Sequence, residues 1–153
     1  MDKDGELKLE LVQQADYRFA VHFPSPSIAP LVTDEEVPVG AGAGPSPTQL
    51  LGAAVANCLA ASLLFALRKF HNDPRSLRAE VAVRLARNEQ RRLRVGGIGV
   101  DLHLGLARAE VKMLERILEQ FEDFCVVTQS VRAAVPVQVR VIDEAGQILK
   151  PAS

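Results

Sequence analysis

Aromatic residues, cysteine and an excess of either charge are scarce in this sequence of 153 residues. Tryptophan is absent, tyrosine occurs once, and the charged side chains leave a formal net charge of −1. A chain with so little net charge has no overall field to attract nucleic acid or an anionic membrane, so neither is expected as a partner. Hydrophobic residues make up 48% of the chain, and its length predicts a single domain over residues 1–153.

Signatures of cofactor and metal sites are missing as well. The glycine-rich segment at residues 40–44 (GAGAG) has neither the lysine of a phosphate-binding loop nor a following dinucleotide fingerprint. We interpret it as a flexible approach to the helix that follows. The three histidines, His22, His71 and His103, are scattered without metal-ligand spacing. No metal and no cofactor are therefore expected.

Cysteine occurs only twice, as Cys58 and Cys125. Residues 1–6 are charged and do not resemble a secretory signal, which predicts a cytoplasmic protein whose thiols are reduced at rest. Cys58 lies in a predicted apolar helix over residues 47–67, with Ser46, Pro47 and Gln49 marking the start. The thiol is about three turns inside, too far for the helix dipole to acidify it. Any activating charge must come from elsewhere in the fold.

The apolar run at residues 50–67 is long enough that a membrane span has to be weighed against a buried core helix. It is the only such run, and Asn57, Cys58 and Ser62 interrupt it. A helix that is apolar on every side is normally wrapped by protein. One small domain has difficulty covering it completely, so we favour a core helix that a second copy of the chain helps to cover, in a homodimer.

Alternating apolar and polar residues predict strands around this helix. They fall at residues 7–11, 17–23, 81–85, 93–104 and 137–141, with a short one near 28–32. The glycines at 96, 97 and 99 predict a bulge or a sharp twist. A helical stripe predicts a second helix over residues 108–124. The order of strands, helix, strands, helix and strands is typical of an α+β fold with a mainly antiparallel sheet.

Two interpretations of the cysteines stay open at this point: both are small buried hydrophobic residues, or they form a redox pair beside a cation. Arg18 shares a strand face with His22, and its guanidinium would hold a thiolate without titrating. Glu122 and Asp123 just before Cys125 are expected to raise its pKa, unless they are simply exposed.

An arginine cluster surrounds the turn between the two predicted strands after the central helix. Nucleic-acid binding is one interpretation, but no aromatic residues are interleaved, so we favour solvated charges that protect an edge hairpin. The cluster comprises Arg84, Arg87, Arg91, Arg92 and Arg94.

Two segments carry a resemblance to a known family. Residues 44–58 (GPSPTQLLGAAVANC) resemble the cysteine helix of the OsmC/Ohr family, the osmotically inducible and organic hydroperoxide resistance proteins. Residues 121–132 (FEDFCVVTQSVR) are similar to that family's second cysteine segment, and the resemblance spans essentially the whole chain. It implies an intertwined homodimer whose mainly antiparallel sheets wrap two central helices, with sites at the subunit interface.

The resemblance also implies a function: thiol-dependent reduction of organic hydroperoxides in oxidative-stress defence. Cys58 matches the peroxidatic cysteine, Cys125 the resolving cysteine with which it forms a disulfide, and Arg18 the activating arginine, while a cellular dithiol is the reductant. Peroxidase members carry a glutamate at the position of Thr48 that fixes the arginine. Its absence leaves two possibilities: an acid among residues 34–36 replaces it, or the protein is a non-catalytic binding module or thiol redox sensor.

Overall fold

The computed structural model describes residues 5–153, which form two compact units, one extending to Leu50 and the other running from Leu51 to Ser153. Part of the charged start of the chain, on which the expectation of no secretory signal depends, lies outside the described residues. That a single domain covers residues 1–153 stays a prediction. Each unit is described by itself.

The first unit is built on a three-stranded antiparallel sheet in the order β1 (Glu10–Ala15), β2 (Arg18–His22) and β3 (Leu31–Thr33). The first strand begins later than the predicted residues 7–11 and continues to Ala15. Asp16, with a φ of 46°, instead makes the reversal. All six residues of β1 are exposed, so this strand has no covered face within the unit.

The long helix α1 (Pro47–Lys69) begins at the predicted residue. The Ser46 hydroxyl accepts the Gln49 backbone N–H at 3.3 Å, while the Gln49 side-chain oxygen accepts the Ser46 N–H at 2.8 Å. This reciprocal pair satisfies two amides that a helix start otherwise leaves without partners. The prediction of a capping box followed by proline is confirmed.

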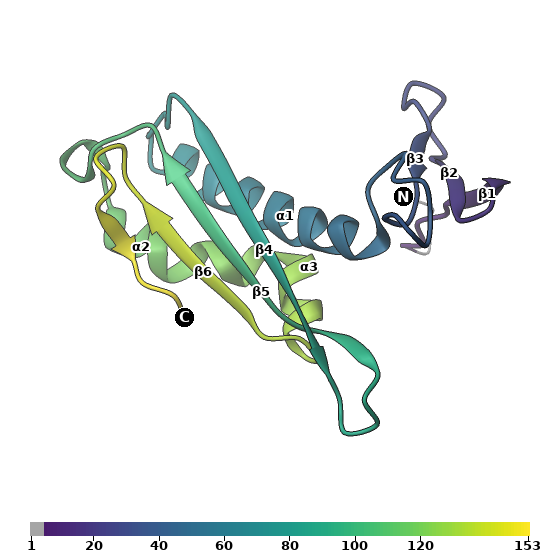
Figure 1. Ribbon diagram of the computed structural model, residues 1–153. Helices are drawn as coiled ribbons and strands as arrows, with labels where there is room; N and C mark the ends of the chain where they lie inside the picture. The colour runs from purple at the N-terminus through teal and green to yellow at the C-terminus, as the bar shows by residue number, and fades with distance from the viewer. Residues whose placement is uncertain (1–4) are drawn as a thin grey trace. The chain divides into compact units, whose positions relative to one another are not determined.

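The second unit is a four-stranded sheet in the order β4 (Leu77–Arg87), β5 (Leu93–Leu104), β6 (Val137–Ile142) and β7 (Ile148–Lys150). Its pairs are antiparallel except for β5 with β6, which are parallel. Parallel neighbours need a long crossover, and the short helices α2 (Leu114–Gln120) and α3 (Val126–Arg132) lie in it. Figure 1 shows α1, α2 and α3 covering the same face of this sheet.

The glycine-rich part of β5 contains the predicted bulge. Arg84 pairs with Gly97 and Leu85 with Val95, which leaves Gly96 without a partner in the register. On the covered face, α1 approaches β4 closely at Gly52, where an added Cβ would lie 2.6 Å from Val83 Cγ2. A glycine is therefore required for this helix–strand contact.

The predicted continuous helix over residues 108–124 is wrong. The segment divides into the 3₁₀ turn η1 (Arg108–Glu110), α2, and the 3₁₀ turn η2 (Phe121–Phe124), with Met113 at a left-handed φ of 57°. The cause is a distant side chain. Asn72 donates to the Lys112 carbonyl at 3.0 Å and accepts its N–H at 2.8 Å, which takes both backbone groups from the helical pattern. The helix α3 was not predicted.

The core of the second unit lies between the sheet and the helices. It includes Val55, Leu59 and Leu63 of α1 together with alternate residues of β5 and β6. A second face of α1 stays uncovered, with Phe65 63% exposed and small residues before it, namely Ala53, Ala54, Asn57 and Ala61. By length and composition α1 could cross a membrane, but a core helix passes the same test, and 44% of its most apolar window is buried.

Candidate functional site

Cys58 is held by α1 at the edge of the core. Its neighbours Val55 and Leu59 are fully buried, whereas Cys58 itself is half-buried and packs against the core residues. With the helix starting at Pro47, Cys58 lies about three turns from its first residue. The sequence prediction of a thiol on a packed helix is confirmed, and Cys58 is the more exposed of the two cysteines.

Cys125 lies at the junction between η2 and α3 and is 0% exposed. Its backbone N–H donates to the Glu122 carbonyl at 3.1 Å, which closes the preceding turn. Its thiol donates to the hydroxyl of Thr128, with Sγ and Oγ1 2.9 Å apart. Thr128 is also 0% exposed. A buried thiol is thus held by a buried hydroxyl from the first turn of the next helix.

The structure brings the two cysteines together. The pKa of Cys125 is raised by burial and, next in importance, by the neighbouring Cys58 side chain, while Thr128 opposes the rise. Both residues are free thiols. The redox interpretation requires the two cysteine side chains to lie close together, and the sequence alone could not show this.

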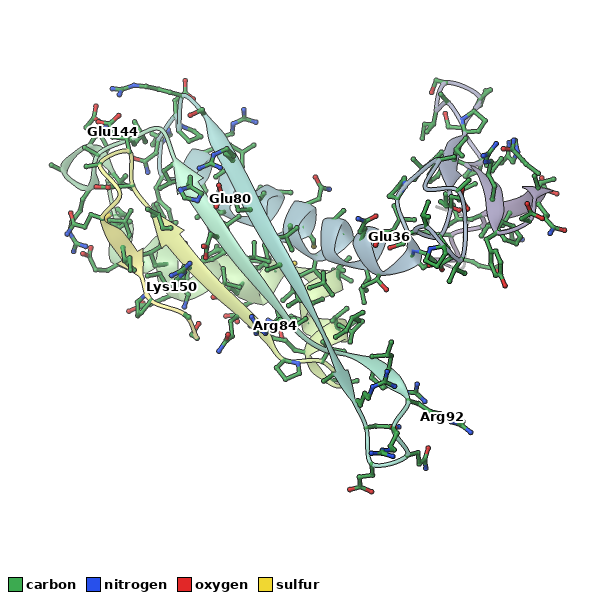
Figure 2. The ribbon with its side chains drawn as sticks, viewed as in Figure 1. Glu36, Glu80, Arg84, Arg92, Glu144 and Lys150 are labelled. Atoms are coloured by element: carbon green, nitrogen blue, oxygen red, sulfur yellow. The ribbon has the colours of Figure 1, made fainter. Side chains whose placement is uncertain are left out.

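The expected effect of Glu122 and Asp123 on Cys125 is not found among the causes of its raised pKa. Glu122 is 7% exposed, and its carboxylate is occupied by an ion cluster: it contacts the Arg132 guanidinium and lies 3.1 Å from Lys150 Nζ. Arg132 also donates to the Val137 carbonyl at 3.2 Å. These charges fasten the Cys125 segment to β6 and β7, and Figure 2 shows Lys150 at the edge of the sheet.

In the first unit, Arg18 faces Asp34. The Arg18 Nε lies 3.9 Å from Asp34 Oδ2, and this buried Nε has no hydrogen-bond partner within the described residues. The carboxylate side chain is 2% exposed, whereas that of Arg18 is 37% exposed. Of the three acids at residues 34–36, Asp34 is the one paired with Arg18, while Glu36 accepts a hydrogen bond from Gln49 at 3.4 Å beside the start of α1 (Figure 2).

The glycine-rich loop is organised around the same carboxylate. Asp34 accepts backbone N–H groups from Glu35, Ala41 and Ala43 at 2.9, 3.2 and 3.1 Å. The Ala43 hydrogen bond does most to lower the Asp34 pKa, against the effect of burial, and the Arg18 charge lowers it further. The interpretation of the loop as a flexible approach is therefore corrected: its amides are bound to an internal anion.

Beside this carboxylate the first unit has a cavity of about 210 Å³. Its lining is mainly apolar and aromatic, and it comprises Leu11, Tyr17, Phe19, Thr33, Asp34, Glu35 and Pro47. The cavity and the Arg18–Asp34 pair belong to the first unit, whereas Cys58, Cys125 and Thr128 belong to the second. The structure thus gives two local groups of side chains, each with its own geometry.

Other candidates from the sequence are not part of these groups. The five arginines of the β4–β5 hairpin are exposed, and Figure 2 shows Arg92 near its tip, which fits the interpretation as solvated charges. Over residues 5–153, no three His, Cys, Asp or Glu side chains gather in an arrangement that would hold a metal. Thr128 was not predicted from the sequence. The one feature that could have pointed to it is its position three residues after Cys125.

An α+β fold that pairs a half-buried thiol on a long core helix with a buried second thiol defines a class of dithiol protein. A family model described as OsmC-like protein matches residues 40–140, and the chain belongs to this family. A comparison with curated proteins gives no match.

Solved structures show the same fold at low identity. An OsmC-like protein of unknown function from Vibrio cholerae is 15% identical with a TM-score of 0.75, covering 90% of this chain and 99% of that one. The organic hydroperoxide resistance protein OhrB of Bacillus subtilis is 17% identical, with a TM-score of 0.63 and coverage of 88% and 97%. An organic hydroperoxide resistance protein OsmC from Legionella pneumophila is 18% identical, with a TM-score of 0.65 and coverage of 88% and 96%.

Proposed function

We propose that this protein is a thiol-dependent peroxidase that reduces organic hydroperoxides in the cytoplasm. The observation that carries the proposal is the pair of free thiols, Cys58 half-buried and Cys125 fully buried, that interact across the core of the second unit. Family membership and neighbours named for organic hydroperoxide resistance support a peroxide-related redox function.

In the first step the Cys58 thiolate attacks one oxygen of the hydroperoxide. A sulfur–oxygen bond forms, the oxygen–oxygen bond breaks, and the alkoxide takes up a proton and leaves as the alcohol. Cys58, now two electrons more oxidised, is a sulfenic acid. Its partial exposure suits this role, because a peroxidatic thiol has to be reached by substrate.

In the second step the Cys125 sulfur attacks the Cys58 sulfur, and the oxygen leaves as water with the proton from Cys125. The product is a Cys58–Cys125 disulfide, which a cellular dithiol reduces by thiol–disulfide exchange. No resident cofactor enters either step. The raised pKa of Cys125 fits a thiol that attacks only after Cys58 has been oxidised.

Arg18 is proposed as the positive charge that stabilises the Cys58 thiolate, with Asp34 in place of the family's helix glutamate. Thr48 cannot pair with a guanidinium, but the Asp34 carboxylate faces Arg18 and is itself fixed by three backbone amides. Because Asp34 faces the Nε side, the terminal nitrogens of the guanidinium stay available to an anion.

We further propose that the working form is a homodimer. The support is apolar surface that a single chain leaves open: one face of α1 around Phe65, and Leu11 and Val12 of β1. Covering such surface releases it from water, which drives association.

The alternative is a non-catalytic OsmC-like module that binds an apolar ligand, or a thiol sensor that is oxidised without turnover. The feature that favours it is Thr48 at the position of the helix glutamate. A steady-state assay with cumene hydroperoxide and a dithiol separates the two, since a sensor forms the disulfide but consumes peroxide only once.

The direct test treats the reduced protein with substoichiometric cumene hydroperoxide and maps its cysteines by mass spectrometry. We expect the loss of two hydrogens and a linked Cys58–Cys125 peptide in the wild type. Cys58→Ser should form no intramolecular link, and Cys125→Ser should stop at a Cys58 sulfenic acid that dimedone traps. Two free thiols after excess hydroperoxide would refute the peroxidase.

A further inference from the structure

We propose that Thr128 is a catalytic residue of the resolving step: its hydroxyl orients the Cys125 sulfur and donates to the thiolate as it attacks oxidised Cys58. This inference rests on the proposed function. The observation behind it is the 2.9 Å contact between Cys125 Sγ and Thr128 Oγ1, in a place where both residues are 0% exposed.

Burial makes the chemistry of Cys125 difficult. Only the thiolate is a good nucleophile, and an apolar site disfavours the charged form. Cys125 belongs to the apolar core cluster that also contains Ile117, Phe121 and Val139. With water excluded, a side chain of the protein has to supply the stabilising hydrogen bond.

A threonine hydroxyl meets both requirements of the step. It has one donor and two acceptor positions, and its proton rotates to suit the partner. In the resting state it accepts the thiol proton, which fixes the direction of the sulfur lone pairs. As that proton passes to the Cys58 sulfenic oxygen, the hydroxyl rotates and donates to the developing thiolate, which forms the sulfur–sulfur bond while the oxygen leaves as water. Thr128 is neither oxidised nor consumed.

The local fold supplies the geometry. Cys125 precedes the first residue of α3 and Thr128 is the third residue of that helix, so one turn returns the hydroxyl to the sulfur. The cluster of Glu122 with Arg132 and Lys150 fastens the same segment to the sheet. The helix on one side and the ion cluster on the other therefore hold the contact between Cys125 and Thr128 in place before Cys58 is oxidised.

The test compares three variants that change one hydroxyl each. Thr128→Val removes the hydroxyl at nearly constant volume, Thr128→Ser keeps it, and Ser130→Ala removes an exposed hydroxyl of the same helix that bonds only to the Val126 carbonyl. Circular dichroism and thermal unfolding establish that each variant is folded.

Rapid-quench mass spectrometry with cumene hydroperoxide and dimedone separates the two chemical steps. We expect Thr128→Val to form the Cys58 sulfenic acid at the wild-type rate and to form the disulfide about tenfold more slowly, the effect of one lost hydrogen bond to a charged group. Thr128→Ser and Ser130→Ala should stay within about threefold of the wild type. A disulfide rate in Thr128→Val equal to that of the wild type would overturn the proposal.

The pH profile gives a readout that altered packing alone would not move. The titratable group that acts on the Cys125 thiol is Cys58 from α1, whereas the ion cluster of Glu122 with Arg132 and with Lys150 of β7 is not among the causes of its raised pKa. These are common to all variants, so the comparison isolates Thr128. The rate of disulfide formation should reach its plateau at a higher pH in Thr128→Val than in Thr128→Ser.

A separate measurement keeps this inference distinct from the peroxidase proposal. In a Cys58→Ser background, ultraviolet titration of the Cys125 thiolate requires no peroxide, and Thr128→Val should raise the Cys125 pKa relative to Thr128→Ser. If Cys58 resists hydroperoxide in every variant, the peroxidase proposal fails and so does the resolving step. A raised Cys125 pKa would then show only that the hydroxyl stabilises the thiolate, and an unchanged one would refute that too.

Discussion

At the scale of the residue, the chemistry rests on small groups whose surroundings set their charge. Cys125 is kept neutral by burial, while Asp34 is kept ionised by three amides and a guanidinium. The two shifts have opposite signs because Cys125 is buried beside a second thiol and a single hydroxyl, whereas Asp34 accepts hydrogen bonds from several donors. Asp34 therefore has two effects to be tested, one on activity and one on stability.

We expect Asp34→Asn to lower peroxide turnover about tenfold or more, because Arg18 loses the charge that orients it. The loss should lie in Cys58 oxidation and not in the formation of the disulfide. Stopped-flow measurement of both steps checks this, with Glu35→Gln as the control because its side chain is not paired with Arg18. Equal losses in the two variants would contradict a specific role for Asp34.

The same carboxylate predicts how stability depends on pH. Its folded pKa lies below its ordinary value of 3.8, so its stabilisation is complete above that pH and is lost as pH falls through the lowered value. Urea unfolding of the wild type and Asp34→Asn at about pH 7 and about pH 3 measures this. The advantage of the wild type should shrink on acidification, and a constant difference would refute the assignment.

At the scale of the element, α1 has two roles: it carries Cys58, and it packs closely on β4. The close approach depends on Gly52, since an added Cβ would lie 2.6 Å from Val83 Cγ2. The capping box at Ser46 fixes where the helix begins, and so the depth of Cys58 within it. Position along the helix and distance from the sheet are thus set by different residues.

Gly52→Ala is expected to destabilise the fold by about 1–3 kcal/mol, because the added methyl group overpacks the contact with Val83. Chemical denaturation measures the loss. Ala53→Ser, on the exposed side of the same turn, should change stability by no more than about 0.5 kcal/mol. An unaffected Gly52→Ala would mean that the helix and β4 can separate without cost.

At the scale of the whole molecule, the main open question is what covers the apolar surface of the single chain. Phe65 on α1 is 63% exposed, and Val81 and Leu85 of β4 are also exposed. A second copy is the partner that the family resemblance implies, and the open faces are where it would be required.

Phe65→Glu should therefore yield a monomer, because a carboxylate cannot be buried at a helix contact without a partner. Phe65→Leu keeps an apolar side chain and should stay dimeric. Light scattering after gel filtration reads the mass of each variant, and circular dichroism verifies the fold. A monomeric wild type, or a dimeric Phe65→Glu, would show that this face is not the interface.

The sequence by itself determined the features that depend on near neighbours. The start of α1 follows from Ser46, Pro47 and Gln49, and the strands β4 to β6 follow from alternation, because caps and periodicity act over a few residues. The bulge in β5 could also be predicted from its glycines, because glycine is otherwise uncommon inside a strand. The match of Cys58 to a peroxidatic cysteine came from its family-like segment, whereas its partial exposure was not predicted.

Only the tertiary structure decided what depends on residues far apart in the chain. Asn72 breaks the predicted second helix by binding Lys112, and Asp34, not its acidic neighbours, pairs with Arg18. Cys125 is brought beside Cys58 and Thr128. Such contacts form when distant segments are packed together, and a side chain's local sequence does not record which partner the packing will bring. The packing of distant segments therefore decided which thiol is buried and which hydroxyl lies next to it.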